Sequence, residues 1–234
     1  MGEFGTIKVV SLFIPGLNLT VQVNPVTIFT TWGICLFLIG VASVASYRLR
    51  KIPSRFQALI ELLYESFRSL TIETIGEIGH RYVPYIFTLF LFVLFSNWIS
   101  VIPIFSSPTG DLNTCLGLGL IAFFIAHGTS IKERGIGGYL KMYLEPFPFL
   151  LPSNLVSEMG KLISHSFRLF GNIYAGGIVV ALIPFIVLKL LGAWGVPLLL
   201  VMMPVLKAFF DVFVGAVQAF VFALLAAAYI SVLL

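Results

Sequence analysis

Residues 196–234 read VPLLLVMMPVLKAFFDVFVGAVQAFVFALLAAAYISVLL, an apolar run that contains only two charged side chains. The run before it, residues 154–191, is also mostly apolar and has no strong helix-breaking pair. Each run has about 38 residues and as an α-helix extends about 57 Å, whereas the hydrocarbon core of a bilayer is about 30 Å thick. The sequence therefore predicts two long helices that tilt steeply, kink or protrude. In the alternative, only residues 173–191 span the membrane and residues 154–172 form a surface helix.

The composition places the chain among membrane proteins. Of its 234 residues, 59% are hydrophobic and only 10% are charged, against about 25% charged in an ordinary soluble domain. A soluble fold of this size leaves roughly 30% of its unfolded surface in water and cannot hide so much apolar area. We therefore expect an all-α integral membrane protein in contact with lipid. The composition excludes a soluble domain, a disordered chain and a nucleic-acid binder.

The cysteines and the first residues indicate no disulfide, metal site, cofactor or cleaved leader. Cys35 and Cys115 lie inside apolar runs and have no metal-ligand spacing. Glu3 stands where a signal peptide would carry positive charge. The expected location is therefore a membrane into which the chain inserts as it is synthesised, a bacterial plasma membrane (the inner membrane).

The loops between the apolar runs predict the orientation of the chain. The first span, residues 26–47, is followed by the cations Arg48, Arg50, Lys51 and Arg55. A helical hairpin is expected over residues 82–130, and its outer turn contains Asp111 and no cation. The loop after this hairpin carries Lys132, Arg134 and Lys141. Because short cationic loops stay in the cytoplasm, we expect the N-terminus outside and the C-terminus in the cytoplasm.

Residues 56–77 differ from the spanning runs. Acidic side chains, Glu61, Glu65 and Glu73 among them, are interspersed with apolar ones at spacings of three and four, so that the apolar set shares one face. This pattern predicts an amphipathic helix on the cytoplasmic membrane surface. The alternative is an ordinary soluble linker helix.

These predictions combine into a single membrane domain, residues 1–234, with about five transmembrane helices. Its expected parts are an outer N-terminal segment (1–25), a first span (26–47), the surface helix (56–77), a helical hairpin (82–130) and a long tilted hairpin (152–234).

Four charged side chains fall inside the long hairpin: Lys161, Arg168, Lys207 and Asp211. Estimates of the free-energy cost of an arginine at the centre of a bilayer run from about 2.5 to more than 10 kcal/mol, so such residues usually mark a pathway or a buried pair. Helical spacing adds Asn172 to the stripe of the first arm and Gln218 to that of the second arm. Two facing polar stripes of this kind are typical of the lining of an ion path.

Each of these residues also has a structural interpretation. Arg168 could extend to the membrane edge, and Lys207 and Asp211 could form a self-neutralising pair. Lys161 fits an interfacial anchor and His165 a packed histidine. No nucleophile constellation and no Walker-type glycine loop occur in the sequence, so the chain is not expected to hydrolyse nucleotide.

Three segments resemble the F-type ATP synthase subunit a, the membrane stator subunit of the Fo sector. They are SHSFRLFGNIYAGG (164–177), PTGDLN (108–113) and VQAFVFALLAAAYIS (217–231). The order and spacing of these segments match that family over nearly the whole chain. The resemblance implies a stator that translocates H⁺ or Na⁺ beside a rotating c-ring and binds the peripheral-stalk b subunits.

The resemblance also implies roles for individual residues. Arg168 falls on the essential arginine of the family, and Asn172 and Gln218 fall on polar residues beside it. Ser164 lies at the position of the inner access channel, and Asp211 at that of the outer one. The sequence departs from the family at Gly177, where many members have Glu, so that Asp211 is expected to supply the missing titratable group. Further candidates for the ion path are Lys161, His165, Lys207 and Asp111.

Two other classes of protein compete with this interpretation. A secondary membrane transporter with an intramembrane Arg/Asp site often has two related halves, and no internal repeat is evident in the sequence. A structural membrane scaffold would tolerate substitution of Arg168 and Asp211 at full activity. Neither the coupling ion nor the size of the c-ring can be read from this chain, because the selective site lies on the partner.

Overall fold

The computed structural model describes residues 10–14, 19–47, 53–102, 105–145 and 147–234. Its α-helices are α1 (Pro25–Tyr47), α2 (Arg55–Ile75), α3 (Val83–Trp98), α4 (Leu112–Leu144), α5 (Leu151–Leu191), α6 (Gly195–Lys207) and α7 (Gly215–Leu233). Short 3₁₀ turns connect them: η1 (Glu77–Arg81), η2 (Ile99–Val101), η3 (Pro108–Gly110), η4 (Pro148–Leu150) and η5 (Gly192–Trp194). A π-helical segment, η6 (Ala208–Val214), joins α6 to α7. The expected all-α membrane architecture is confirmed.

A short antiparallel hairpin precedes the first helix and was not anticipated from the sequence. Strand β1 (Val10–Ile14) pairs with β2 (Leu19–Val23), with Val10 opposite Val23 and Ile14 opposite Leu19. Both strands are rich in β-branched residues, which favour extended backbone. The hairpin lies outside the stretches that could span a bilayer, so it does not change the membrane architecture.

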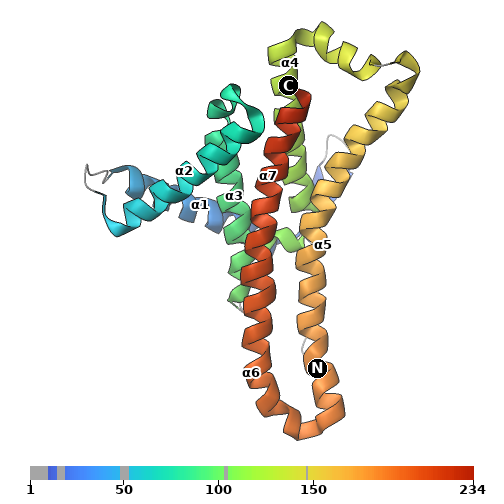
Figure 1. Ribbon diagram of the computed structural model, residues 1–234. Coiled ribbons are helices and arrows are strands. Elements are labelled where there is room, and N and C mark those ends of the chain that lie inside the picture. Colours follow the sequence, from blue (N-terminus) through green and yellow to red (C-terminus); the bar gives the residue numbers. More distant parts are fainter. Residues whose placement is uncertain (1–9, 15–18, 48–52, 103–104, 146) are drawn as a thin grey trace.

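Four helical stretches of the described chain are long and apolar enough to cross a membrane: Pro25–Tyr47, Val83–Val101, Leu112–Leu144 and Pro148–Leu233. The last of these turns back on itself at η5, where Gly192 has a φ of 55° that favours glycine. It therefore forms two antiparallel arms, α5 and α6–η6–α7, which lie side by side (Figure 1). Helix α5 is continuous over 41 residues despite Pro184, so the alternative of a separate surface helix over 154–172 is wrong.

Helix α7 is the centre of the bundle and packs against α2, α3, α4 and α5. Its buried face consists mainly of small side chains, among them Ala219, Ala223 and Ala227, each completely buried. Small residues let neighbouring helix backbones approach closely where no hydrophobic drive separates helix from lipid. At Gly215 the approach of α3 is so close that a Cβ would lie 2.9 Å from Cβ of Asn97. The polar residues of α7 are therefore held in a fixed position.

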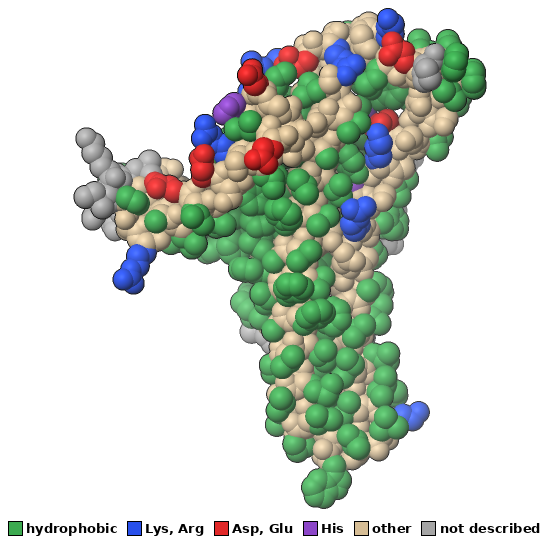
Figure 2. Space-filling view, viewed as in Figure 1, with side chains coloured by type: hydrophobic (Ala, Val, Ile, Leu, Met, Phe, Trp, Pro, Cys, Tyr) green, Lys and Arg blue, Asp and Glu red, His purple; other side chains and the backbone are tan. Residues whose placement is uncertain are grey.

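The charged residues gather at one end of the molecule. Figure 2 shows acidic and basic side chains over α2 and the adjacent end of the bundle, while the two arms toward η5 are almost entirely hydrophobic. Helix α2 is not among the candidate spans, and it turns Phe67 and Thr71 into the bundle while its charged residues stay exposed or partly exposed. Phe67 packs on Phe90 of α3, with ring centroids 4.4 Å apart. This amphipathic arrangement agrees with a surface helix.

Helix α1 is the outermost element and contacts α3 and η3. Most of its apolar side chains are exposed, with Phe29 at 76% and Trp32 at 67%. In a bilayer such side chains lie against lipid or another membrane subunit, since hydrocarbon is their natural solvent.

We expect Gly215→Ala to destabilise the fold by about 1–3 kcal/mol, because the added methyl group overlaps Asn97 and forces α3 and α7 apart. The matched control is Gly117→Ala in α4, where a Cβ meets no atom within 4 Å. That variant should be neutral or stabilising by up to about 1 kcal/mol, since alanine has the higher helix propensity. Unfolding by SDS titration in mixed micelles measures both. Equal effects of the two substitutions would contradict the packing argument.

Candidate functional site

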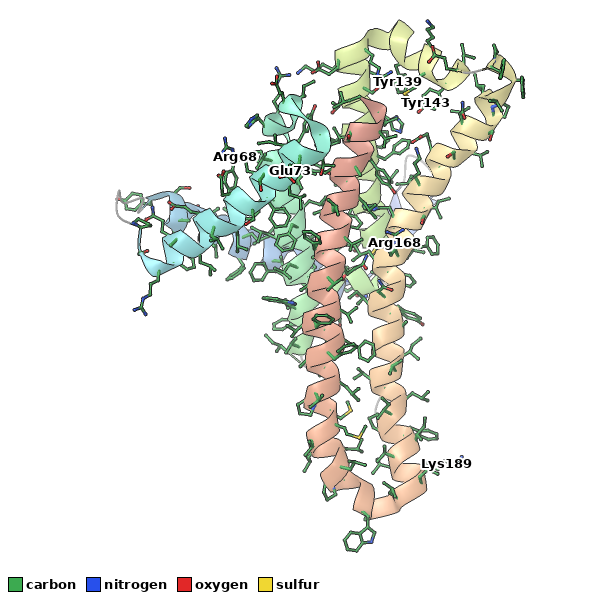
Figure 3. All side chains as sticks on the ribbon, in the orientation of Figure 1. Arg68, Glu73, Tyr139, Tyr143, Arg168 and Lys189 are labelled. Carbon is green, nitrogen blue, oxygen red and sulfur yellow. The ribbon has the colours of Figure 1, made fainter. Side chains whose placement is uncertain are left out.

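Arg168 lies about midway along α5 on an open face of the helix (Figure 3). Its side chain is exposed in this single chain, and its guanidinium makes no hydrogen bond or ion pair with the residues that the structure describes. A guanidinium remains charged under all working conditions. A fixed positive charge is therefore presented to whatever adjoins this face.

Polar side chains flank Arg168 at intervals of one helical turn. Ser164 stands four residues before it and Asn172 four residues after it, and both are exposed on the same face. On this side of α5, Gly171 has no atom within 4 Å of the position that a Cβ would take. The face is therefore polar, and no bulky side chain at Gly171 prevents a neighbouring helix from approaching.

Asn172 connects the two arms. Its Nδ2 donates a hydrogen bond of 2.6 Å to Oε1 of Gln218 on α7. Gln218 is only 4% exposed, and its Nε2 has no partner among the described residues. The resemblance placed both residues beside Arg168, and the structure brings them together at the same level of the two arms.

His165 lies on the inner side of α5, away from the open face. It is 1% exposed, and its ring packs against Phe222 with centroids 3.8 Å apart and against Tyr229 at 5.3 Å. Neither ring nitrogen has a hydrogen-bond partner in the described part of the chain. The packed interpretation of this histidine agrees with the geometry, but its two nitrogens are left without partners.

Lys161 forms an ion pair that was not anticipated. Its Nζ lies 2.5 Å from Oε1 of Glu158, one turn earlier on α5. The Tyr229 hydroxyl donates a 3.0 Å hydrogen bond to the main-chain oxygen of Lys161. In the sequence, Glu158 stands near the start of the run 154–191, where an acidic residue favours a helix N-terminus. The sequence pattern therefore did not indicate that Glu158 pairs with Lys161.

Lys207 and Asp211 form a second pair, near the middle of the second arm and on the η5 side of Gln218. Nζ of Lys207 lies 3.5 Å from Oδ2 of Asp211 and donates a 2.9 Å hydrogen bond to the main-chain oxygen of Ser100 in η2. Both side chains are partly buried. Lys207 is therefore anchored to the end of α3, while Asp211 keeps three of its four lone-pair positions for other partners.

Asp211 stands in the π-helical segment η6, which α3 supports. A π-helical turn is rare, and such turns are frequent at functional sites. Trp98 Nε1 donates to the oxygen of Val212 at 3.0 Å, and Asn97 Nδ2 donates to the oxygen of Gly215 at 2.8 Å. These two bonds satisfy carbonyl groups in and just after η6, so tertiary contacts hold the irregular turn.

The remaining candidate, Asp111, caps a helix. Its carboxylate accepts from the main-chain N–H of Asn113 at 2.9 Å at the start of α4. Thr109, in the same PTGDLN segment, is completely buried and donates to Oδ1 of Asn97 at 2.6 Å. The outer turn therefore positions α3 and α7 through Asn97, a polar residue inside an apolar run that sequence reasoning missed.

Comparison with known proteins identifies similar sequences over most of the chain. The family model described as ATP synthase A chain matches residues 28–231. The chain is 36% identical over 215 residues to ATP synthase subunit a 1 of Chlorobium luteolum, covering 88% of this chain and 87% of that protein. It is 36% identical over 221 residues to the sodium ion specific ATP synthase subunit a of Propionigenium modestum, covering 88% and 73%. It is 39% identical over 204 residues to ATP synthase subunit a 1 of Syntrophotalea carbinolica, covering 86% and 82%.

We expect a coupling free energy of about 1 kcal/mol between Asn172 and Gln218, the usual net value of one hydrogen bond. Asn172→Ala and Gln218→Ala each remove the bond, and the double variant should be less destabilised than the sum of the single variants. A double-mutant cycle of unfolding free energies in mixed micelles measures the coupling. Strict additivity would mean that the bond contributes nothing.

Proposed function

The chain belongs to the ATP synthase A chain family, and we propose that Arg168 is the fixed charge that separates two aqueous half-channels in it. Membership makes the chain an ion-translocating membrane subunit of the Fo sector, part of a complex with a rotor ring and other subunits. It contributes ion transport to that complex, while nucleotide chemistry belongs to other subunits. The secondary-transporter and scaffold alternatives have no support from the family match.

The observation that carries the proposal is the open position of Arg168. The guanidinium has no partner among the described residues and stands on a face of α5 that polar and glycine residues keep accessible. An unpaired guanidinium in a spanning segment is costly unless water or an opposite charge meets it. We assign this face to the c-ring, whose helices would bring carboxylates past Arg168.

The physical consequence of this contact is a directed exchange of ions. A carboxylate that reaches Arg168 is stabilised in its ionised form, because an opposite charge nearby favours the charged state. It therefore releases its ion on one side and can recover one only from the other side. The same positive charge repels a cation that would otherwise pass directly between the half-channels. Ion flow then requires rotation of the ring, and rotation drives ATP synthesis.

The candidate residues of the two half-channels lie on opposite sides of Arg168. The contact between Asn172 and Gln218 fixes the level at which the arms meet. Asp211 precedes Gln218 by seven residues and lies toward η5, whereas Ser164 precedes Arg168 on α5 and lies toward the charged end. We assign Asp211, Gln218 and Asn172 to the outer half-channel and Ser164 to the inner one. A Cβ at Gly177 would meet no atom within 4 Å, so this position has room for the larger side chain that many members of the family carry there.

We propose that the chain lies in a bacterial plasma membrane with its charged end in the cytoplasm. The cations Lys132, Arg134 and Lys141 in the second half of α4 support this orientation, since cationic segments stay inside. The coupling ion is a proton or a sodium ion. The peripheral-stalk b subunits are the expected static partners, and the exposed apolar face of α1 is available to a membrane subunit of that kind.

We expect Arg168→Ala to abolish ion-driven ATP synthesis, because the barrier between the half-channels loses its charge. Arg168→Lys should fail as well, since an ammonium lacks the planar fork of the guanidinium and loses its proton more readily when desolvated. ATP synthesis in membrane vesicles that contain the assembled complex measures both. Arg68→Ala is the matched control, because Arg68 lies on α2 in an exposed pair with Glu65. Normal synthesis in either Arg168 variant overturns the proposal.

We expect Asp211→Asn to slow ion flux by about tenfold or more, since it removes a titratable group from the outer half-channel. Lys207→Gln removes the partner of Asp211 and the bond to Ser100 but leaves that carboxylate in place, so its effect should be several times smaller. Passive ion flux through vesicles stripped of the catalytic sector compares the two. Equal effects would favour a purely structural pair.

A further inference from the structure

Helix α4 is longer than a bilayer crossing requires, and it bends where that crossing ends. The bend is at Gly135, whose φ of 73° favours glycine. The stretch from Leu112 to Arg134 extends about 34 Å at 1.5 Å per residue, which is enough to cross a hydrocarbon core of about 30 Å. The second half of α4, residues 136–144, therefore begins at the membrane boundary. Figure 1 shows that it runs across the charged end of the molecule toward the start of α5.

Two tyrosines hold the second half of α4 in place. The hydroxyl of Tyr139 lies 3.0 Å from Nδ1 of His127, which belongs to the spanning half of the helix. Tyr143 is buried, and its hydroxyl lies 3.2 Å from that of Tyr139. Nδ2 of Asn154 in α5 donates a 2.9 Å hydrogen bond to the main-chain oxygen of Tyr143. Both tyrosines therefore point back toward the spanning part of the bundle (Figure 3), which fixes the direction of the other faces of this segment.

The exposed apolar side chains of the second half of α4 continue the tyrosine face. At about 100° per residue, five side chains follow one another over an arc of about 140°: Tyr139, Tyr143, Ile136, Leu140 and Leu144. Ile136 is 69% exposed and Leu140 is 56% exposed. Lys141 lies about 200° from Tyr139 around the helix, so it points away from the membrane. An apolar face turned to the membrane and a cation turned to water are typical of a helix that lies in the membrane interface.

The apolar surface continues beyond the end of α4. Phe147 and Phe149 stack with ring centroids 5.7 Å apart, and they are 57% and 76% exposed. An apolar surface of this kind marks contact with a membrane or another protein. In the spanning half of the same helix Phe124 is 67% exposed, where lipid would lie. The lipid that contacts the first half of α4 therefore adjoins the apolar face of the second half.

Cations stand where the phosphate groups of that lipid layer would lie. Lys132 and Arg134 come directly before the bend and Lys141 follows it, and all three are exposed. The two acids of this stretch already have basic partners, because Glu133 pairs with a cation of η1 at 3.4 Å and Glu145 pairs with Lys141 at 3.7 Å. Lys132 makes no ion pair with the residues that the structure describes. Cations beside an apolar helix face attract anionic lipid headgroups.

We propose that the second half of α4 lies in the headgroup region of the leaflet at the charged end and binds anionic phospholipid there. Ile136 and Leu140 contact the acyl chains, and the two stacked phenylalanines extend this contact. Lys132 and Lys141 bind the phosphate groups. This inference does not require the half-channels, so its tests are independent of those of the proposed function.

Spin labels on adjacent residues test where the segment lies. Leu140→Cys and Lys141→Cys are made in a Cys35→Ser background and assembled into a complete ATP synthase without other reactive cysteines, in phospholipid vesicles. The Cys35→Ser parent gives the background from the buried Cys115. Each cysteine then carries a nitroxide. Electron paramagnetic resonance measures how often the nitroxide collides with oxygen, which concentrates in lipid, and with nickel ethylenediaminediacetate, which stays in water.

We expect the ratio of oxygen to nickel collisions to be at least about threefold higher at Leu140→Cys than at Lys141→Cys. Equal ratios, or a higher ratio at Lys141→Cys, would overturn the proposal. Protection of Leu140→Cys from both reagents would mean that another subunit covers this face, and it would overturn the proposal as well. Ile136→Cys, on the same face, provides a second label for the lipid side should Leu140→Cys fail to assemble.

Photoactivatable phospholipids test the preference for anionic headgroups. The assembled complex is irradiated in vesicles with either photoactivatable phosphatidylglycerol or photoactivatable phosphatidylcholine, and adducts on residues 131–145 are counted by peptide mass spectrometry. We expect at least about threefold more adduct with phosphatidylglycerol, and loss of this excess in the double variant Lys132→Gln/Lys141→Gln. Lys189→Gln is the control, because Lys189 lies in the last turn of α5 at the opposite end of the molecule. Equal labelling by the two lipids, or an unchanged excess in the double variant, would contradict the binding of headgroups by these lysines.

Discussion

The structure depends on one electrostatic constraint: a permanent positive charge on a long apolar helix that none of the described residues neutralises. Arg168 has no hydrogen bond or ion pair within the described residues, although Lys161 and Lys207 on the same two arms each have an acidic partner nearby. A chain under selection for stability alone would pair this guanidinium or replace it, given the cost of an unpaired charge in a bilayer. Its open position therefore supports the proposed contact with water and with a carboxylate of another subunit.

Keeping such a charge at a defined depth requires a rigid support, and α7 provides it. Its alanine-rich face lets α3 and α4 pack against it closely, and Gly215 lets the backbone of α3 approach further. The hydrogen bond from Asn172 to Gln218 then holds α5 at a fixed level relative to α7. Small residues on the inner side thus hold α7 in place, and Gly171 on the outer side of α5 leaves room for the proposed neighbouring subunit.

Most of the architecture follows from the sequence because hydrophobic length and charge placement act locally. They predicted the spanning helices, the amphipathic α2 and the unbroken length of α5 against its alternative. The features that sequence reasoning missed depend on tertiary contacts. The π-helical turn at Asp211 is held by Asn97 and Trp98 from α3, more than a hundred residues away. The hydrogen bond between the Tyr139 hydroxyl and Nδ1 of His127 joins two parts of α4 on either side of the kink at Gly135. The kink has a positive φ, and the sequence does not show which glycines adopt one.

The length of the arms has a mechanistic reason that connects these features. At 1.5 Å per residue, Glu158 lies about 21 Å from Asn172 along α5, and Asp211 lies about 10 Å from Gln218, the partner of Asn172, along the opposite arm. The two ionisable groups are therefore separated by roughly 30 Å along the arms, close to the thickness of the hydrocarbon core, with Arg168 and the Asn172–Gln218 bond between them. Under the proposed function, shorter helices would bring the two groups within reach of one another and so remove the need for a rotor. The continuous 41-residue α5 and the irregular second arm thus keep ionisable groups on opposite sides of Arg168, as the proposed function of two separate half-channels requires.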